Sequence, residues 1–397
     1  MNNNYNRAYK ILESQIKGAV RSEQTRLDVL ASHNKLRDKG HVVPLDELSE
    51  DVRELALLEP GYYIPWRTVW NSSSLSTPCR MVFDASSMTP GGECLNNILA
   101  KGENKLSNLL HILIQFRVLP FAFTGDVSMA YNGIKLKPTH YRYQKYLWVE
   151  DLNPENPVKI MIVKTLIYGV RPSGNQLMAG FGKLADYCIK EYAEHAEGAR
   201  ILISNTYVDD AVRSCEDELS MEQESESLIF VLNQAGLGVK SITKRGSKPS
   251  ELVSGDGVHV GVVGLLWDSE KDQIGIDVKP LYFGKMKRGK APELVTGDVK
   301  AALSSVFSRR TLWGQVAKFW DPMGLLTPLT SRLKLDLRSV TLLGLDWDDK
   351  IPDEYLDTWV RNLSDIETAK EIRFRRAVIP PGALECYVDM ITSTDAS

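Results

Sequence analysis

Two adjacent aspartates, Asp209 and Asp210, stand in the stretch "NTYVDDAV" between two short apolar runs. A carboxylate that leaves water must be paired, protonated or bound to a cation, so neighbouring acids in an apolar setting require a physical reason. A solvated turn is one reason, because aspartate favours turns and like charges repel only weakly in water. A divalent cation held at the tip of a β-hairpin is the other. The pair alone does not separate the two.

A third carboxylate, Asp126, ends the apolar stretch "FAFTGD". Metal-dependent phosphoryl transfer requires carboxylates on rigid strands that converge on one point. The alternative role for Asp126 is a helix N-cap, since a helical turn is predicted directly after it. The central order β–α–β–β–α–β resembles a ferredoxin-like sheet, in which the first and third strands are neighbours. On that topology we expect Asp126 to meet Asp209 and Asp210.

The elements that would position these acids follow from the hydrophobic pattern. Residues 5–58 predict helices, and the chain beyond Lys279 again predicts mostly helices. Between them, strands are predicted within 61–70, 79–86, 121–128, 145–149, 159–169, 201–214, 258–268 and 273–278, and helices within 106–119, 175–193 and 221–236.

Composition and charge bound the class of protein. The chain has 397 residues, 43% of them hydrophobic and 25% charged, as in a soluble globular protein of two or three domains. No apolar run approaches the ~20 residues of a membrane span, and the first residues lack the apolar core of a secretory signal. Five dispersed cysteines suit reduced thiols. We therefore expect an intracellular protein without a membrane partner.

The net charge of -3 conceals an uneven distribution. From Lys279 to Arg338 there are twelve Lys and Arg residues but only four Asp and Glu residues. Such a segment is either a solvated face or an electrostatic footprint for nucleic-acid phosphates.

Two motifs carry a family resemblance. "YVDD" after an apolar run and "FTGDVSMAY" resemble the carboxylate motifs of reverse transcriptases. The chain is similar, from about Tyr5 to Ser397, to the polyproteins of BEL/Pao-type long-terminal-repeat retrotransposons. The stretches that carry this second resemblance are "YYIPWRTV", "CRMVFDASS", "LIYGVRPSGNQ", "VGLLWD", "AKFWDPMGLLTPL" and "LDWDDKIPDEYLDTW".

The resemblance implies an α+β right-hand polymerase with fingers, a ferredoxin-like palm and a helical thumb and connection. It divides the chain into an N-terminal helical segment (1–58), fingers and palm (59–278), thumb and connection (279–375) and the start of an RNase H-like domain (376–397). The C-terminal part also resembles a segment labelled the Pao retrotransposon peptidase. A retroviral-type aspartic peptidase needs a D-[ST]-G triplet, however, and the sequence has none.

The resemblance also assigns roles to single residues. Asp126, Asp209 and Asp210 would bind two Mg²⁺ ions, with Mn²⁺ as an alternative, and the Val127 carbonyl would complete the shell. Residues that would contact the nucleotide are Arg80, Tyr131, Tyr168, Gly169 and Lys240. Lys244 rivals Lys240 as the donor of a proton to pyrophosphate, and each of these residues could instead be an ordinary surface or core residue. Gly264, Leu265, Leu266 and Trp267 would form the hairpin that grips the primer.

The implied function is RNA-directed DNA synthesis by nucleotidyl transfer, from deoxynucleoside triphosphates on a primed RNA or DNA template, in a cytoplasmic retrotransposon particle. A catalytically inactive or domesticated nucleic-acid-binding remnant is the alternative. At the end of the chain, Asp395 in "DAS" resembles the first RNase H carboxylate. The partner carboxylates of that site do not follow it, so we expect no cleavage of RNA.

Overall fold

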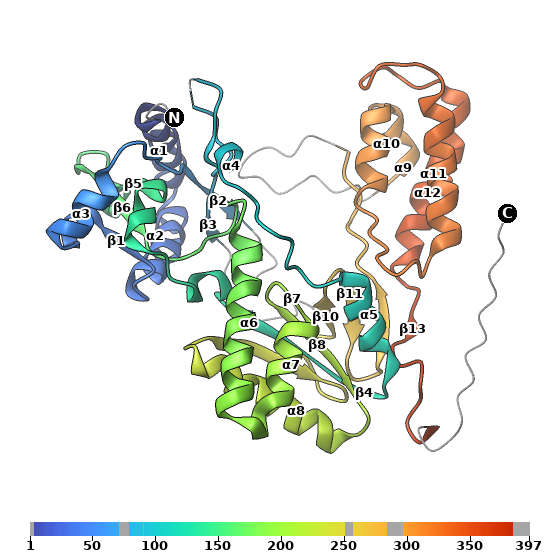
Figure 1. The fold of residues 1–397 in the computed structure, drawn as a ribbon. Coiled ribbons are helices and arrows are strands. Elements are labelled where there is room, and N and C mark those ends of the chain that lie inside the picture. The colour runs from blue at the N-terminus through green and yellow to red at the C-terminus, as the bar shows by residue number, and fades with distance from the viewer. Residues whose placement is uncertain are drawn as a thin grey trace.

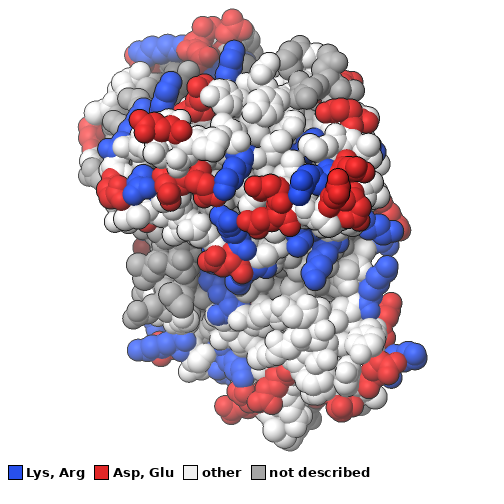
Figure 2. Space-filling model, turned by 90° about the vertical axis from the view of Figure 1, so that its left-hand side faces the viewer, with Lys and Arg blue, Asp and Glu red and all other residues white. Residues whose placement is uncertain are grey.

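The computed structural model describes residues 4–70, 79–89, 91–250, 257–283, 295 and 297–383. The ribbon separates into an N-terminal lobe on the left, a central lobe at the bottom and a C-terminal helical lobe on the right (Figure 1). Within the described ranges, no helix is long and apolar enough to cross a membrane. Acidic and basic side chains are mixed over the face seen in Figure 2.

The N-terminal lobe packs helices against two small antiparallel sheets, ordered β1-β6-β5 and β2-β3. Its core is rich in aromatic side chains, and Tyr62, Trp66 and Trp148 are fully buried within it. The elements are α1 (Tyr5–Ala19), α2 (Glu23–Asp38), β1 (Val42–Pro44), η1 (Leu45–Glu47), α3 (Glu50–Leu57), β2 (Trp66–Trp70), β3 (Cys79–Phe83), α4 (Leu95–Ile98), η3 (Pro138–Tyr143), β5 (Lys145–Val149), η4 (Glu150–Leu152) and β6 (Val158–Val163).

The prediction of helices throughout residues 5–58 is therefore wrong at β1. This three-residue strand pairs with β6, and Val42 is fully buried. Pro44 ends the strand, where its missing N–H costs no central ladder bond. A three-residue edge strand has too few residues to produce a period-2 pattern.

The central lobe is a four-stranded antiparallel sheet in the order β7-β8-β4-β9. Its chain order, β4–helices–β7–β8–α8–β9, gives the predicted β–α–β–β–α–β arrangement with the first and third strands as neighbours, although its last strand, β9, is not among the predicted strands. The ferredoxin-like sheet is thus confirmed. Its elements are α5 (Leu109–Val118), β4 (Phe121–Ser128), η2 (Ala130–Gly133), α6 (Ser173–Glu191), η5 (Ala193–His195), α7 (Ala196–Ser204), β7 (Thr206–Tyr207), β8 (Asp210–Cys215), α8 (Glu218–Gln234) and β9 (Gly238–Lys244).

One predicted strand of this lobe is largely helix. Residues 201–204 complete α7, which leaves only Thr206 and Tyr207 for β7. α7 packs very close to α8 at Gly198. A Cβ added to this glycine would lie 2.4 Å from the Ser227 carbonyl carbon. Ile201 and Leu202 are fully buried as a result. Tertiary packing here overrides the strand preference of β-branched residues.

A second antiparallel sheet, ordered β10-β11-β12-β13, joins the central lobe to the helical lobe. The predicted hairpin within 258–278 and the mostly helical chain beyond Lys279 agree with the structure. The elements are β10 (His259–Val262), β11 (Leu265–Asp268), β12 (Gln273–Ile276), α9 (Val299–Ser304), α10 (Arg309–Val316), α11 (Thr327–Thr341), η6 (Asp353–Tyr355), α12 (Leu356–Ala369) and β13 (Phe374–Arg375).

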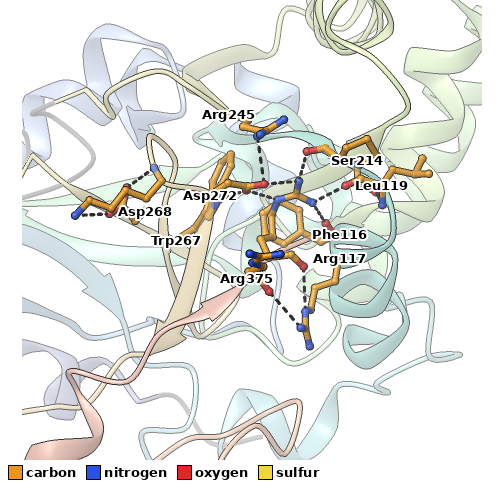
Figure 3. Close-up of polar contacts among 12 residues, drawn as sticks. Phe116, Arg117, Leu119, Ser214, Arg245, Trp267, Asp268, Asp272 and Arg375 are labelled. Atoms are coloured by element: carbon orange, nitrogen blue, oxygen red, sulfur yellow. Dashed lines mark hydrogen bonds and ion pairs between the residues drawn. The ribbon is translucent and has the colours of Figure 1, made fainter. Parts of the chain in front are cut away.

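A buried arginine fastens the end of the helical lobe to the central lobe. The Arg376 side chain has 0% exposure and makes a salt bridge with Asp272, with Nε 2.6 Å from Oδ1. It also donates to the backbone carbonyls of Phe116, Leu119 and Pro120. Figure 3 shows this network, in which Asp272 also accepts from Trp267 Nε1. A buried guanidinium is tolerated only when its charge and N–H groups are paired, so this contact fixes the chain path after α12.

A buried histidine makes the N-terminal lobe sensitive to acid. His33 is 1% exposed, stacks on Trp148 with ring centroids 3.7 Å apart, and hydrogen bonds to the Tyr146 hydroxyl over 2.9 Å. Burial lowers the pKa of His33 from 6.5 to about 4. Between these two values the unfolded chain binds the proton and the folded chain does not. The contribution of His33 to stability is therefore complete above pH 6.5 and falls as the pH approaches 4.

We expect His33→Gln to remove this acid sensitivity. The free energy of unfolding of the parent should fall by about 3 kcal/mol more than that of the variant between pH 7 and pH 4. Urea unfolding at the two pH values measures the difference, with exposed His140→Gln as the control. Equal pH dependence in the parent and in His33→Gln would contradict the prediction.

Candidate active site

The β4–β8 register places two of the three predicted carboxylates opposite each other. Asp126 on β4 pairs with Asp210 on β8. Directly opposed residues in an antiparallel pair have Cβ atoms roughly 5 Å apart. Asp126 lies inside β4, which continues to Ser128, so the alternative of a helix N-cap is wrong. The strand pairing brings together two positions that are far apart in the sequence.

The third carboxylate lies in the turn between β7 and β8. Val208 occupies the first turn position with a φ of 61°, as two-residue hairpin turns require. A β-branched residue in this region is strained by about 1–3 kcal/mol. The backbone carbonyl of Asp209 accepts a hydrogen bond from the Val127 N–H at 2.9 Å, which ties the turn to β4 beside Asp126. All three aspartates therefore belong to one rigid unit.

Two of the three carboxylates have raised pKa values. Burial, followed by the charges of Asp209 and Asp126, raises the pKa of Asp210 to about 7. Burial also raises the pKa of Asp126. The positive charges of Lys240 and Arg80 lower this pKa, and the negative charge of Asp209 raises it further. Raised carboxylate pKa values in one place are typical of functional sites and of positions that a cation would stabilise.

Two of the carboxylates have side-chain partners. Lys240 Nζ lies 3.4 Å from Asp126 Oδ2, and the Tyr168 hydroxyl donates to Asp209 Oδ2 at 2.8 Å. In the part of the chain that the structure describes, no group of three His, Cys, Asp or Glu side chains is arranged to hold a metal ion. The donor set still fits a hard divalent cation in kind, because such ions prefer carboxylate oxygens. Binding would require Asp209 and Asp126 to exchange their present partners.

The two candidate lysines are distinguished by their surroundings. Lys240 lies on β9 beside the aspartates, whereas Lys244 is paired with Glu222 of α8. Of the two, Lys240 is the lysine that the structure brings to the carboxylates. β9 was not predicted as a strand, yet its pairing with β4 places Lys240 there.

Two tyrosines connect the aspartates to the predicted nucleotide pocket. The rings of Tyr131 and Tyr168 have centroids 4.1 Å apart. Tyr131 is buried in the core of the central lobe, whereas Tyr168 is 52% exposed. Tyr131 is therefore a core aromatic. Its ring also contacts Tyr168, whose hydroxyl binds Asp209. Arg80 is an exposed residue of β3, and its charge acts on Asp126 across the two lobes.

The loop at Gly169 requires glycine. Its φ is 88°, and an added Cβ would lie 2.6 Å from the Phe83 carbonyl oxygen. One residue that the sequence analysis did not single out, Asn96, braces this loop. Asn96 Nδ2 donates to the Gly169 carbonyl at 2.8 Å, and the Arg171 N–H donates to Asn96 Oδ1 at 2.8 Å. Only the neighbouring "LIYGVRPSG" motif pointed to this region, because Asn96 has no local pattern.

Of the four residues predicted to grip the primer, two are buried in the core and two are accessible to solvent. Leu265 and Trp267 of β11 are fully buried, while Gly264 is exposed and Leu266 is half-buried. The alternation follows from the period of a strand, and it leaves Gly264 and Leu266 as the accessible residues. Trp267 packs edge-on against Phe116 with ring centroids 5.2 Å apart, so it supports the hairpin from beneath.

The basic segment Lys279–Arg338 is partly neutralised within the protein. Four of its cations form ion pairs with carboxylates: Lys279 with Asp277, Lys300 with Asp357, Arg310 with Asp348 and Arg332 with Asp365. These pairs weaken the prediction of a phosphate footprint at those positions. Lys285, Lys287, Arg288 and Lys290 lie outside the described residues, as does Asp395.

Comparison with solved structures identifies the fold. The foamy viral protease–reverse transcriptase dRH in complex with ds DNA matches with a TM-score of 0.50 and 16% identity, over 86% of this chain and 47% of that chain. The foamy viral protease–reverse transcriptase in complex with RNA/DNA hybrid matches with a TM-score of 0.50 and 14% identity, over 88% and 38%. The fold is that of a retroviral reverse transcriptase. This chain spans less than half of each foamy viral chain.

A family model agrees with this fold. Residues 308–397 match the Pao retrotransposon-like RNaseH-like domain. Its description is RNaseH-like, in place of the peptidase label expected for this segment, and within 308–383 the match contains α10, α11, α12 and β13. No curated protein matches the chain. The predicted resemblance to a retroelement polymerase region is confirmed by the fold and by this match.

We expect Gly169→Ala to destabilise the protein by at least about 1–2 kcal/mol, because alanine is strained at positive φ and its Cβ would meet the Phe83 carbonyl. Gly182→Ala is the matched control. Gly182 lies inside α6 with nothing within 4 Å of an added Cβ, so alanine there should stabilise the helix by about 0.5–1 kcal/mol. Urea unfolding measures both changes. Equal effects of the two substitutions on the free energy of unfolding would contradict the requirement for glycine at position 169.

Proposed function

We propose that this chain is an RNA-directed DNA polymerase of a BEL/Pao-type retrotransposon. It would add deoxynucleotides from their triphosphates to a primer annealed to an RNA or DNA template. The observation that carries the proposal is the pairing of Asp126 with Asp210, with Asp209 in the joining turn bonded to β4. The reverse transcriptase fold supports it.

Asp126, Asp209 and Asp210, together with the Val127 carbonyl, would hold two Mg²⁺ ions, or Mn²⁺ in their place. When bound, such ions supply Lewis-acid activation of the primer 3′-hydroxyl and charge neutralisation at the triphosphate. The raised pKa values of Asp126 and Asp210 support this assignment, because a bound cation would stabilise the charged carboxylates that burial, and then the neighbouring carboxylate charges, disfavour.

The remaining residues of the site would act directly on the substrate. Lys240, placed beside Asp126, would donate a proton to the departing pyrophosphate. Arg80 would neutralise charge on the triphosphate, since a guanidinium binds phosphate oxygens in a planar fork. Tyr131 would lie under the sugar and exclude a 2′-hydroxyl by size. At Gly169 the backbone itself would approach the nucleotide, and Tyr168 would line the same pocket.

A nucleic-acid-binding remnant without catalytic activity is the second candidate. The observation that favours it is the engagement of Asp209 by Tyr168 and of Asp126 by Lys240. Such contacts would be permanent in a protein that no longer binds metal. In a polymerase they would yield to the incoming cation, so the two candidates differ in extension of a primer rather than in binding of nucleic acid.

Primer extension on poly(rA)/oligo(dT) tests the proposal. The parent should extend the primer with Mg²⁺ and stop when a chelator is added. Asp126→Asn and Asp209→Asn should each lower the rate by at least about 10²-fold, because each removes a charge at the reacting centre and keeps the side-chain shape. The unfolding temperature should not fall, since each change relieves repulsion within the site.

Asp186→Asn is the matched control, because Asp186 is an exposed carboxylate on α6. It should extend at the parent's rate. Extension at that rate by either site variant would contradict the metal assignment. A parent protein that binds the primed template but never extends it would establish the second candidate.

A further inference from the structure

An indole from the helical lobe lies on the tip of the β10–β11 hairpin. An added Cβ at Gly264 would lie 2.7 Å from Trp320 Cδ1 and 2.7 Å from Trp320 Nε1. Real Cβ atoms do not approach other atoms so closely, so a side chain at this position would displace the indole. Trp320 nevertheless remains 55% exposed.

The segment that carries Trp320 is held on both sides. On the C-terminal side, the Asp321 carboxylate accepts hydrogen bonds from the N–H groups of Leu325 at 2.9 Å and Leu326 at 2.8 Å. On the N-terminal side, Lys318 Nζ lies 3.2 Å from the centroid of the Tyr282 ring. These contacts hold the chain on either side of Trp320.

The hairpin tip is strained where Trp320 meets it. Val263 has a φ of 47° and Gly264 a φ of 97°, which is the pattern of a type I′ turn. This turn favours Asn-Gly, and a β-branched residue in its first position is strained by about 1–3 kcal/mol. A strained tip needs support from outside the hairpin, and Trp320 supplies that support on the Gly264 side.

The hairpin is also continuous with the site through one hydrophobic core. Val212 of β8, Val262 of the hairpin and Leu312 of α10 are fully buried members of the same cluster. Tyr207, which pairs with Asp210, packs against that cluster. This shared core sets the position of the hairpin relative to the aspartates.

We propose that Trp320 is a positioning residue that fixes the hairpin tip, and with it the primer 3′ end, relative to Asp126 and Asp210. The proposal rests on the proposed function. Without the indole, the tip would be held by strand pairing and the core alone and would be free to shift. A misplacement of ~1 Å lowers the rate of a positioned reaction by up to about 10²-fold.

Single-turnover extension from a preformed complex with primed template tests the role in the reaction. Trp320→Ala and Gly264→Ala should each lower the maximal rate by about 10- to 100-fold, with little change in the nucleotide concentration that gives half of that rate. Trp320→Phe should retain most of the rate, because a phenyl ring still covers Gly264. Trp313→Ala is the control, since Trp313 is an exposed indole of the same lobe that contacts Trp347.

The double variant decides whether Trp320 and Gly264 act through one contact. If they do, the double variant should be no slower than the slower single variant, because the contact can be lost only once. Multiplied rate losses, or a Trp320→Ala variant as fast as the parent, would overturn the proposal.

Hydrogen exchange of the protein without nucleic acid gives a second readout that needs no activity. Trp320→Ala and Gly264→Ala should both speed exchange of the amides in residues 258–268 and leave β4 unchanged. Unchanged exchange in the hairpin would overturn the proposal. If the parent does not extend a primer at all, the proposed function fails, and the exchange result alone then decides whether Trp320 fixes the tip.

Discussion

The antiparallel pairing of β4 with β8 is the constraint on which the site depends. Its register sets Asp126 against Asp210, although like charges directly opposite each other destabilise a sheet. The buried faces of β4 hold that register. Phe123 packs into the core of the central lobe, and Ala122 faces the core shared with the hairpin and the helical lobe. A slip of one residue would exchange these faces, so the hydrophobic core keeps the two carboxylates together despite their repulsion.

The other lobes are arranged around this pair by a small number of long-range contacts. From the N-terminal lobe, the Phe83 carbonyl lies against Gly169, whose neighbour Tyr168 bonds Asp209. From the other side, Arg376 joins the end of the helical lobe to Asp272 and to the backbone before β4 (Figure 3). Each contact uses a buried charge or a glycine that a larger residue could not replace. The geometry of the site is therefore a property of the whole chain.

The sequence predicts the parts of this arrangement that have local patterns. Asp126 and the Asp209–Asp210 pair stand out because acids beside apolar runs are unusual, and the order of elements was enough to make their strands neighbours. Residues 201–204 contain β-branched side chains, which favour a strand but are also found in helices. These residues form the end of α7 because this helix packs against α8. Strand β9 was missed because its residues are only partly buried and do not alternate clearly. The contact of Trp320 with Gly264 could not be predicted, because no local sequence pattern indicates a contact between residues so far apart in the chain.

Binding of Mn²⁺, followed by electron paramagnetic resonance, tests the central claim that three carboxylates form one cation site. The measurement is made with primed template and a non-hydrolysable deoxynucleoside triphosphate, for the parent and for Asp126→Asn and Asp210→Asn. The parent should deplete the signal of free Mn²⁺, and each variant should lose most of that binding while still binding the primed template. Equal Mn²⁺ binding by the parent and both variants would show that these carboxylates do not form one cation site.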